Sequence, residues 1–171
     1  MTILDLAPMQ VWKDLSDKLQ KKTGLSCNVT DADNKPLFLP EKWANQLCPA
    51  VKGHPEAASA ICAIAMNSMA NEARISKKPV VEPCDLNLVK IAIPVFKDGL
   101  FLGAVGGCGG WIKGDEELEP LPAARLLGED EEKIARMAEG APVLEEKEIA
   151  GALKMVRRAL HEIGADTEAQ S

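Results

Sequence analysis

The 171-residue sequence is poor in aromatic side chains and in positive charge. Phe and Trp make up 4% of it, Tyr is absent, and the formal net charge is −6, with most of the acidic excess between Asp115 and Glu148. Single-stranded nucleic acids are bound by stacking on aromatic rings, and duplexes by basic side chains that neutralise phosphates. We therefore expect no direct binding to nucleic acid.

A long hydrophobic run is also missing. Residues 1–6 show neither the basic flank nor the apolar stretch of an export signal, and no later segment approaches the roughly 20 apolar residues that a membrane helix needs. The length and a hydrophobic content of 46% suit one globular domain with a sizeable core. We expect a cytoplasmic protein with no membrane contact, its single domain spanning residues 5–165, and flexible tails at 1–4 and 166–171.

No catalytic motif stands out. The two histidines, His54 and His161, belong to no HExxH zinc motif and have no serine or cysteine nucleophile and acid in a recognisable pattern. The glycine-rich segment 103–110 follows a strand pattern, lacks the lysine and hydroxyl of a phosphate-binding loop, and does not open a helix. The sequence therefore predicts a binding protein and not an enzyme.

Helical periodicity is clear in several segments. Trp12, Leu15 and Leu19 recur at helical spacing before Gly24, which is a natural helix stop. By the same criteria, we expect helices over residues 8–24, 41–51, 56–75, 129–139 and 145–163. In the last of these, Leu153, Val156 and Leu160 form an apolar face that we expect to contact a partner.

Alternation replaces helical periodicity between Pro79 and Gly110. Val89 and Ile91 are predicted to face one side of a strand and Lys90 the other, and the turn Lys97–Gly99 leads into a returning strand. A second, shorter hairpin is expected from strands at 25–29 and 36–38. This order of elements predicts an α/β (α+β) fold, an antiparallel sheet flanked by helices with further helices at the C-terminus.

Several segments together resemble a known family. They are the helix around Trp12, the cysteines Cys48, Cys62 and Cys84, the strand 91–95, the hairpin 98–107 and the closing segment from Leu127. In this order they resemble the PocR sensory domains, which are PAS-like modules usually attached to transcription regulators or sensor kinases. The resemblance implies a PAS-like fold and a role in prokaryotic signal transduction as a sensor of small organic molecules, short diols among them.

The chain departs from that family pattern at two places. After Cys84 the family commonly has a histidine and a small-residue–Gly–Leu stretch, whereas this chain has Asp85-Leu86-Asn87-Leu88. After the glycine pair the family commonly has glutamine, whereas this chain has Cys108. Both differences fall on the expected ligand-facing end, so the ligand of this chain need not be that of its relatives.

The five cysteines form no CxxC pair, and a secreted disulfide framework is not expected. Three interpretations stay open. Cys48, Cys62, Cys84 and Cys108 converge and hold an iron–sulfur cluster or zinc; or they are small buried apolar groups, for which Cys27 is the clearest case; or two of them form a redox switch.

Four other residues are candidates for the wall of a ligand pocket: Trp43, His54, Met66 and Trp111. In the plainer interpretation the tryptophans and the methionine fill a core, and His54 is a turn residue between Gly53 and Pro55. The resulting functional hypothesis is a sensor that binds a small organic ligand or a cysteine-held metal and signals through a homodimer or a separate partner. The alternative is a thiol-redox or metal-binding protein that uses the same fold as a scaffold.

Overall fold

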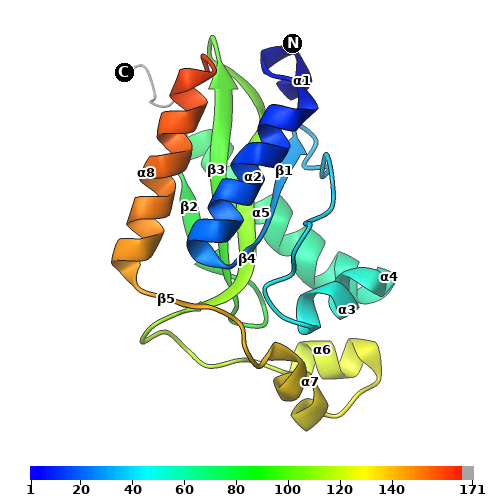
Figure 1. Ribbon diagram of the computed structural model, residues 1–171. Coiled ribbons are helices and arrows are strands. Elements are labelled where there is room, and N and C mark those ends of the chain that lie inside the picture. The colour runs from blue at the N-terminus through cyan, green and yellow to red at the C-terminus, as the bar shows by residue number, and fades with distance from the viewer. Residues whose placement is uncertain (167–171) are drawn as a thin grey trace.

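The computed structural model describes residues 1–166, which form a sheet with helices on both faces (Figure 1). The four main strands are β1 (Ser26–Asp31), β2 (Val80–Pro83), β3 (Val89–Lys97) and β4 (Leu100–Ile112). They are hydrogen-bonded in the order β1-β4-β3-β2, and every pair is antiparallel. A short fifth strand, β5 (Val143–Leu144), runs parallel to the end of β4. The expected α+β fold, with an antiparallel sheet flanked by helices, is confirmed.

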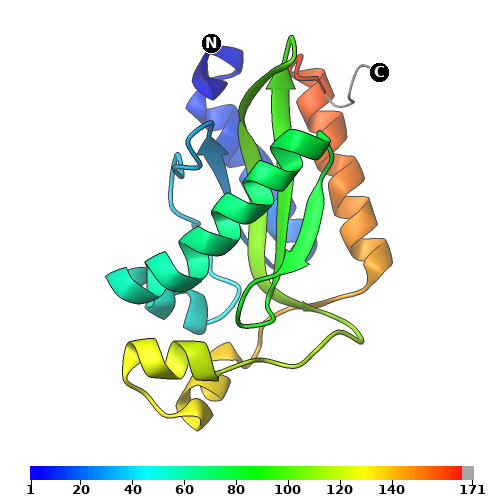
Figure 2. The same cartoon turned by 180° about the vertical axis from the view of Figure 1, so that it is seen from behind.

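The helices fall into three groups. The helices α2 (Met9–Thr23) and α8 (Glu146–Glu162) cover one face of the sheet, and α5 (Ile64–Ser76) crosses the other (Figure 2). Near one end of the sheet lie α3 (Leu47–Gly53), α4 (Pro55–Ala57), the π-helical η1 (Ala58–Ala63), α6 (Leu121–Leu127) and α7 (Glu131–Ala138). No helix within residues 1–166 is both long and apolar enough to cross a membrane.

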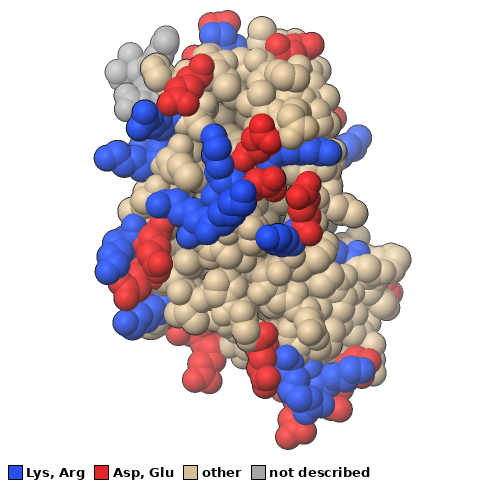
Figure 3. Space-filling model, viewed as in Figure 1, with Lys and Arg blue, Asp and Glu red and all other residues tan. Residues whose placement is uncertain are grey.

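The main core lies between the sheet and the helices α2 and α8. Val89, Ile91, Ile93 and Val95 of β3 pack there against Trp12 and its neighbours, as the alternating pattern predicted. The opposite surfaces of α2 and α8 carry basic and acidic side chains, which gather on the face shown in Figure 3. Burial of one apolar stripe on each helix therefore fixes both helices against the sheet.

The N-terminus is part of this core, which differs from the expected tail at residues 1–4. A first helix, α1 (Ile3–Leu6), precedes α2, and the Ile3 side chain is 1% exposed. The buried Trp12 indole Nε1 donates hydrogen bonds to the backbone carbonyls of Ile3 at 3.2 Å and Ala7 at 3.0 Å. One indole thus ties the first residues to α2. At the other end, Asp166 bridges to Phe96, and the expected tail from 167 onward lies outside the described residues.

The expected partner-binding face of α8 is used within the chain. Val156 and Leu160 are fully buried in the main core, and Leu153 packs against the same core. A partner could reach these side chains only if α8 left the sheet.

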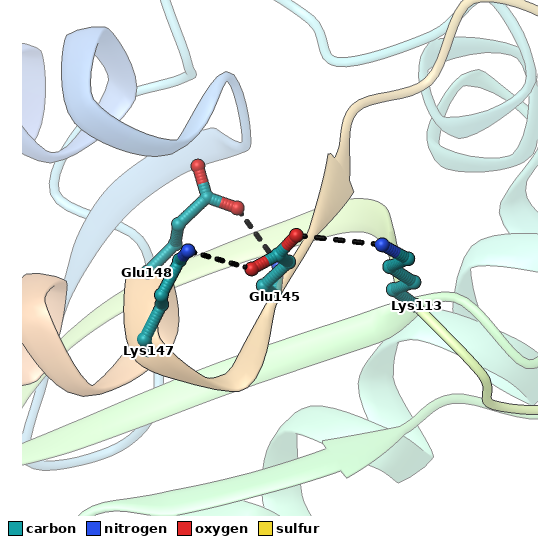
Figure 4. A network of polar contacts seen from close by, with 4 residues as sticks. All are labelled: Lys113, Glu145, Lys147 and Glu148. Atoms are coloured by element: carbon teal, nitrogen blue, oxygen red, sulfur yellow. Dashed lines mark hydrogen bonds and ion pairs between the residues drawn. The ribbon is translucent and has the colours of Figure 1, made fainter.

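Charged contacts secure the start of α8 (Figure 4). The Glu145 side chain and the backbone of that residue form a capping box with Glu148, whose carboxylate accepts the Glu145 N–H at 2.8 Å. Glu145 also pairs with Lys147 at 3.0 Å and, across to the residue after β4, with Lys113 at 3.4 Å. These contacts lie at the surface, so each contributes little alone, but together they fix where the helix begins.

Two expected elements differ from the structure. The strand expected at 36–38 is reduced to a single bridge between Pro36 and Thr30, and β1 pairs with β4 instead. Proline lacks the N–H that continues a ladder, and the Asp31 carboxylate accepts the N–H groups of Asp33 and Lys35, both at 2.9 Å, which closes a tight turn. The helix expected at 41–51 begins only at Leu47, after a series of bends.

The helix expected at 56–75 is present, but it is not uniform. It consists of α4, η1 and α5, with a π-helical segment that contains Cys62. A π-helical turn holds more residues than an α-helical one, which shifts the side chains after it around the axis. Ile61, within the π-helical segment, packs in a buried cluster with Leu86 and Leu88. After that segment, Met69 of α5 packs against the sheet.

Candidate functional site: a cysteine-lined cavity

Four of the five cysteines line one small cavity beside the sheet. Cys48 comes from α3, Cys62 from η1, Cys84 from the turn after β2 and Cys108 from β4. The structure thus brings together all four cysteines that the sequence singled out. The remaining lining residues are Val51, Lys52, Ile61, Leu86, Leu88, Lys90 and Gly109, and the cavity volume is about 30 Å³.

The sheet places two of these side chains next to each other. Lys90 of β3 lies directly opposite Cys108 of β4 in the antiparallel register, so the two side chains are on the same face. Ile91 points to the main core on the opposite face. Strand alternation therefore directs Lys90 toward the side covered by η1 and α5.

A close approach of α3 to β4 forms another part of the wall. The buried Asn45 amide donates from Nδ2 to the Gly109 carbonyl at 2.7 Å, and its Oδ1 accepts the Cys48 N–H at 2.7 Å. Gly109 has φ +98°, and a Cβ built on it would lie 3.2 Å from the Cys48 sulfur. Glycine is needed at 109 both for its backbone angle and for this approach.

The environment keeps the thiols of Cys48, Cys62 and Cys84 protonated. Burial, with a further contribution from the Cys108 thiol, raises the pKa of Cys48 to about 12. Burial also raises the pKa of Cys62 and of Cys84, although the ammonium groups of Lys52 and Lys90 act in the opposite direction on Cys62. Since the thiolate is the reactive form, Cys48, Cys62 and Cys84 are weak nucleophiles near neutral pH.

Lys90 is a functional candidate that sequence reasoning missed. Its side chain is only 4% exposed, and within residues 1–166 it forms no hydrogen bond or ion pair through its ammonium group. A buried charge without a partner is energetically costly. A lysine among apolar strand residues was the available signal, but in the sequence it resembles an ordinary solvent-facing position.

The other predicted pocket residues lie outside the cavity lining. The Trp43 ring centroid is 5.9 Å from the Lys52 Nζ, and His54 Nδ1 accepts the Ala57 N–H at 3.4 Å at the start of α4. Trp111 packs against a second core cluster, which is formed by buried side chains of α3, η1, α6, α7 and the segment 86–88. Met66 is half-buried on α5. His54 is therefore a helix-capping residue in this structure.

Cys27 is separate from the other four cysteines. It is buried in the main core, where its sulfur donates to the Leu25 carbonyl at 3.4 Å. Burial raises the pKa of Cys27 to about 12. This environment is that of a small core residue, as expected from the sequence.

The hypothesis of a zinc or iron–sulfur site is not confirmed by this geometry. Among residues 1–166, no group of three His, Cys, Asp or Glu side chains is arranged to hold a metal ion. Cys48, Cys62, Cys84 and Cys108 share a cavity, but their sulfur atoms do not form a ligand cage.

The sequence matches the family described as the sensory domain found in PocR over residues 5–167, nearly the whole chain. No curated protein and no solved structure matches the chain. The matched residues include the entire sheet and all the segments that line the cysteine cavity. The chain therefore belongs to the family of PocR sensory domains and has a ligand-sensing role in signal transduction.

Proposed function

We propose that this chain senses a small organic molecule that binds in the cavity lined by Cys48, Cys62, Cys84 and Cys108. The observation that carries the proposal is the convergence of four chain segments, each contributing one cysteine, on a single cavity in a sensory domain. The cavity volume is about 30 Å³. Since one water needs roughly 10–15 Å³ on this measure, the ligand would have only a few non-hydrogen atoms.

The departures from the family pattern support a ligand particular to this chain. Leu86 and Cys108 stand where the family pattern commonly has a small residue and a glutamine, and both line the cavity. The larger Leu86 side chain makes that part of the wall more hydrophobic, and the Cys108 thiol replaces the amide of glutamine. The ligand would therefore differ in chemistry from that of relatives with glutamine at this position.

The second core cluster offers a route for the signal. The cavity residues Val51, Ile61, Leu86 and Leu88 belong to the same packed cluster as the buried side chains of α6 and α7. Ligand binding would change the packing of α6 and α7, and a separate partner or a second copy of the chain would detect that change. This proposal replaces the expected output through α8, whose apolar face packs on the sheet.

A cysteine-held metal or a thiol-redox centre is the second candidate. The shared cavity favours it, because four thiols could reach one ion after a local rearrangement. Metal binding would also require loss of the thiol protons, which burial opposes for Cys48, Cys62 and Cys84.

The first test is anaerobic purification with iron and zinc analysis, followed by a thermal-shift screen of short alcohols, diols, amides and acids. We expect a compound that raises the melting temperature of the wild type and of Cys27→Ala but not of the Cys48→Ala/Cys84→Ala double variant. Cys27→Ala is the matched control, because it removes a buried thiol outside the cavity. A stabilising compound whose effect persists in the folded double variant would contradict the proposed site.

A further inference from the structure

We infer that the cavity binds an anion, a short-chain carboxylate whose charged group pairs with the ammonium of Lys90 while its alkyl part contacts Leu86 and Leu88. This inference rests on the proposed function, because it concerns the same cavity, and it adds the chemical class of the ligand.

The position of Lys90 is the first argument. It stands near the start of the inner strand β3, opposite Cys108, and it lines the cavity. The side chain is 4% exposed, so its charged end has little access to bulk water. A lysine that served only to cover the surface would extend its ammonium into solvent, as lysines beside apolar surfaces usually do.

The surrounding charges are the second argument. No Asp or Glu is among the residues that line the cavity. The cross-strand neighbour of Lys90 on β2 is Glu82, but its side chain is exposed and makes no ion pair with Lys90. Lys52 is a second lysine among the lining residues, and its ammonium, which lies 5.9 Å from the centroid of the Trp43 ring, acts on the Cys62 thiol. The site is therefore positively charged and has no negative group of its own.

Three of the cavity thiols do not supply the missing charge. Burial raises the pKa of Cys48, Cys62 and Cys84, so these three neighbours are neutral near physiological pH. A ligand anion that enters the cavity would give Lys90 a partner in a place shielded from water, where a charge-assisted hydrogen bond is strong.

The apolar part of the cavity wall restricts the uncharged part of the ligand. Val51, Ile61, Leu86 and Leu88 present hydrocarbon surface, and the volume of about 30 Å³ excludes large molecules. These features fit a carboxylate of only a few non-hydrogen atoms, because the volume corresponds to two or three water-sized groups at roughly 10–15 Å³ each. Inorganic polyanions could pair with the Lys90 ammonium but would make no apolar contact with this wall.

The experiment compares acids with their amides on the unmodified chain. Formate, acetate and propionate would be titrated by calorimetry against formamide, acetamide and propionamide at constant ionic strength in a chloride buffer. Each pair has nearly the same shape and differs in charge. We expect the carboxylate to bind roughly ten to a hundred times more tightly than the amide, the range for a hydrogen bond to a charged group.

Two variants assign the effect to one residue. Lys90→Met should abolish the preference for the acid, whereas Lys113→Met should retain it, because Lys113 is a surface residue with a side chain that is 70% exposed. Equal affinity for acid and amide, or an unchanged preference in Lys90→Met, would overturn the inference. If Lys90→Met did not fold, the acid–amide comparison on the wild type would still decide it.

The outcomes also separate this inference from the proposed function. Neutral compounds that bind, and lose binding in Cys48→Ala/Cys84→Ala, would support the cavity and refute the anion. Stoichiometric iron in the purified protein would make a negatively charged thiolate cluster the partner of Lys90 and would likewise refute the carboxylate. The acids could also bind equally well to the wild type and to the cysteine double variant but lose affinity in Lys90→Met. That result would support the carboxylate and refute only the proposal that the cysteines form part of its site.

Discussion

Replacement of Lys90 by methionine should make the ligand-free protein more stable. The Lys90 side chain is 4% exposed and its ammonium has no acidic partner among the cavity residues, so the folded state bears the cost of removing that charge from water. Methionine has a similar length and no charge. We expect a gain of about 1–4 kcal/mol in the free energy of unfolding, the range found when buried ion pairs are replaced by apolar residues of similar volume.

Urea unfolding in a chloride buffer free of carboxylates would measure this gain. The midpoint should rise with an unchanged slope, and the melting temperature should rise by roughly 2–4 °C for each kcal/mol. Lys113→Met is the control, because it removes a lysine that is 70% exposed and should change stability by less than about 0.5 kcal/mol. A loss of stability in Lys90→Met would show that Lys90 has favourable partners in the ligand-free fold and would refute this reasoning.

Two further predictions concern the wall of the cavity, and a third concerns two buried thiols. Asn45→Ala should cost about 2–3 kcal/mol in urea unfolding, because it leaves the buried Gly109 carbonyl without its donor. Gly109→Ala should destabilise the fold more than Gly114→Ala: both positions have φ above +90°, but only the Cβ at 109 would meet neighbours within 3.2 Å. Because burial raises the pKa of Cys27 and Cys48 from 9.0 to about 12, the unfolded chain loses those protons first, and the unfolding free energy should fall as the pH rises from 9.0 toward 12.

Each of these has a result that would contradict it. Asn45→Ala with wild-type stability would mean that water replaces the amide. Equal losses in the two glycine variants would show that the backbone angle alone matters and that α3 does not press on β4. A free energy of unfolding that stays constant across the alkaline range, in the wild type and in Cys27→Ala, would mean that neither thiol is shielded from solvent.

The local parts of the fold could be predicted from the sequence. The β3–β4 hairpin follows from alternation and from the turn Lys97–Gly99, where both Asp98 and Gly99 have positive φ. Helix α2 follows from its periodicity and ends at Gly24 with φ +72°. Each of these signals acts between residues that are close in the chain.

Long-range partners were harder to predict. The pairing of β1 with β4 joins residues 72 to 82 positions apart, such as Asn28 and Gly106, and neither strand carries a local signal of the other. The sequence instead favoured a hairpin with 36–38, which is the nearest apolar segment. The short α1 and β5 were missed for a related reason, because contacts with Trp12 and with β4 hold them in place.

At the site, the cysteines could be identified and their surroundings could not. The resemblance and the spacing identified Cys48, Cys62, Cys84 and Cys108, which the structure brings to one cavity. Lys90 looked like any polar residue on the solvent face of a strand, because its burial depends on the helices α3, η1 and α5, which cover that face. The same limit led to the proposal of Trp43 and Trp111 as pocket residues, whereas neither lines the cavity.

The most direct test of the central claim, that the cysteine cavity is the ligand site, is the alkylation rate of each cysteine in the reduced protein. Mass spectrometry would follow all five thiols with and without propionate, propionamide and propanol. The account predicts that a probe which stabilises the fold slows the modification of Cys62, Cys84 and Cys108 far more than that of Cys27, which lies in the main core and reports global opening. Equal slowing of Cys27 and the cavity cysteines, or no slowing of the cavity cysteines by a stabilising probe, would contradict it.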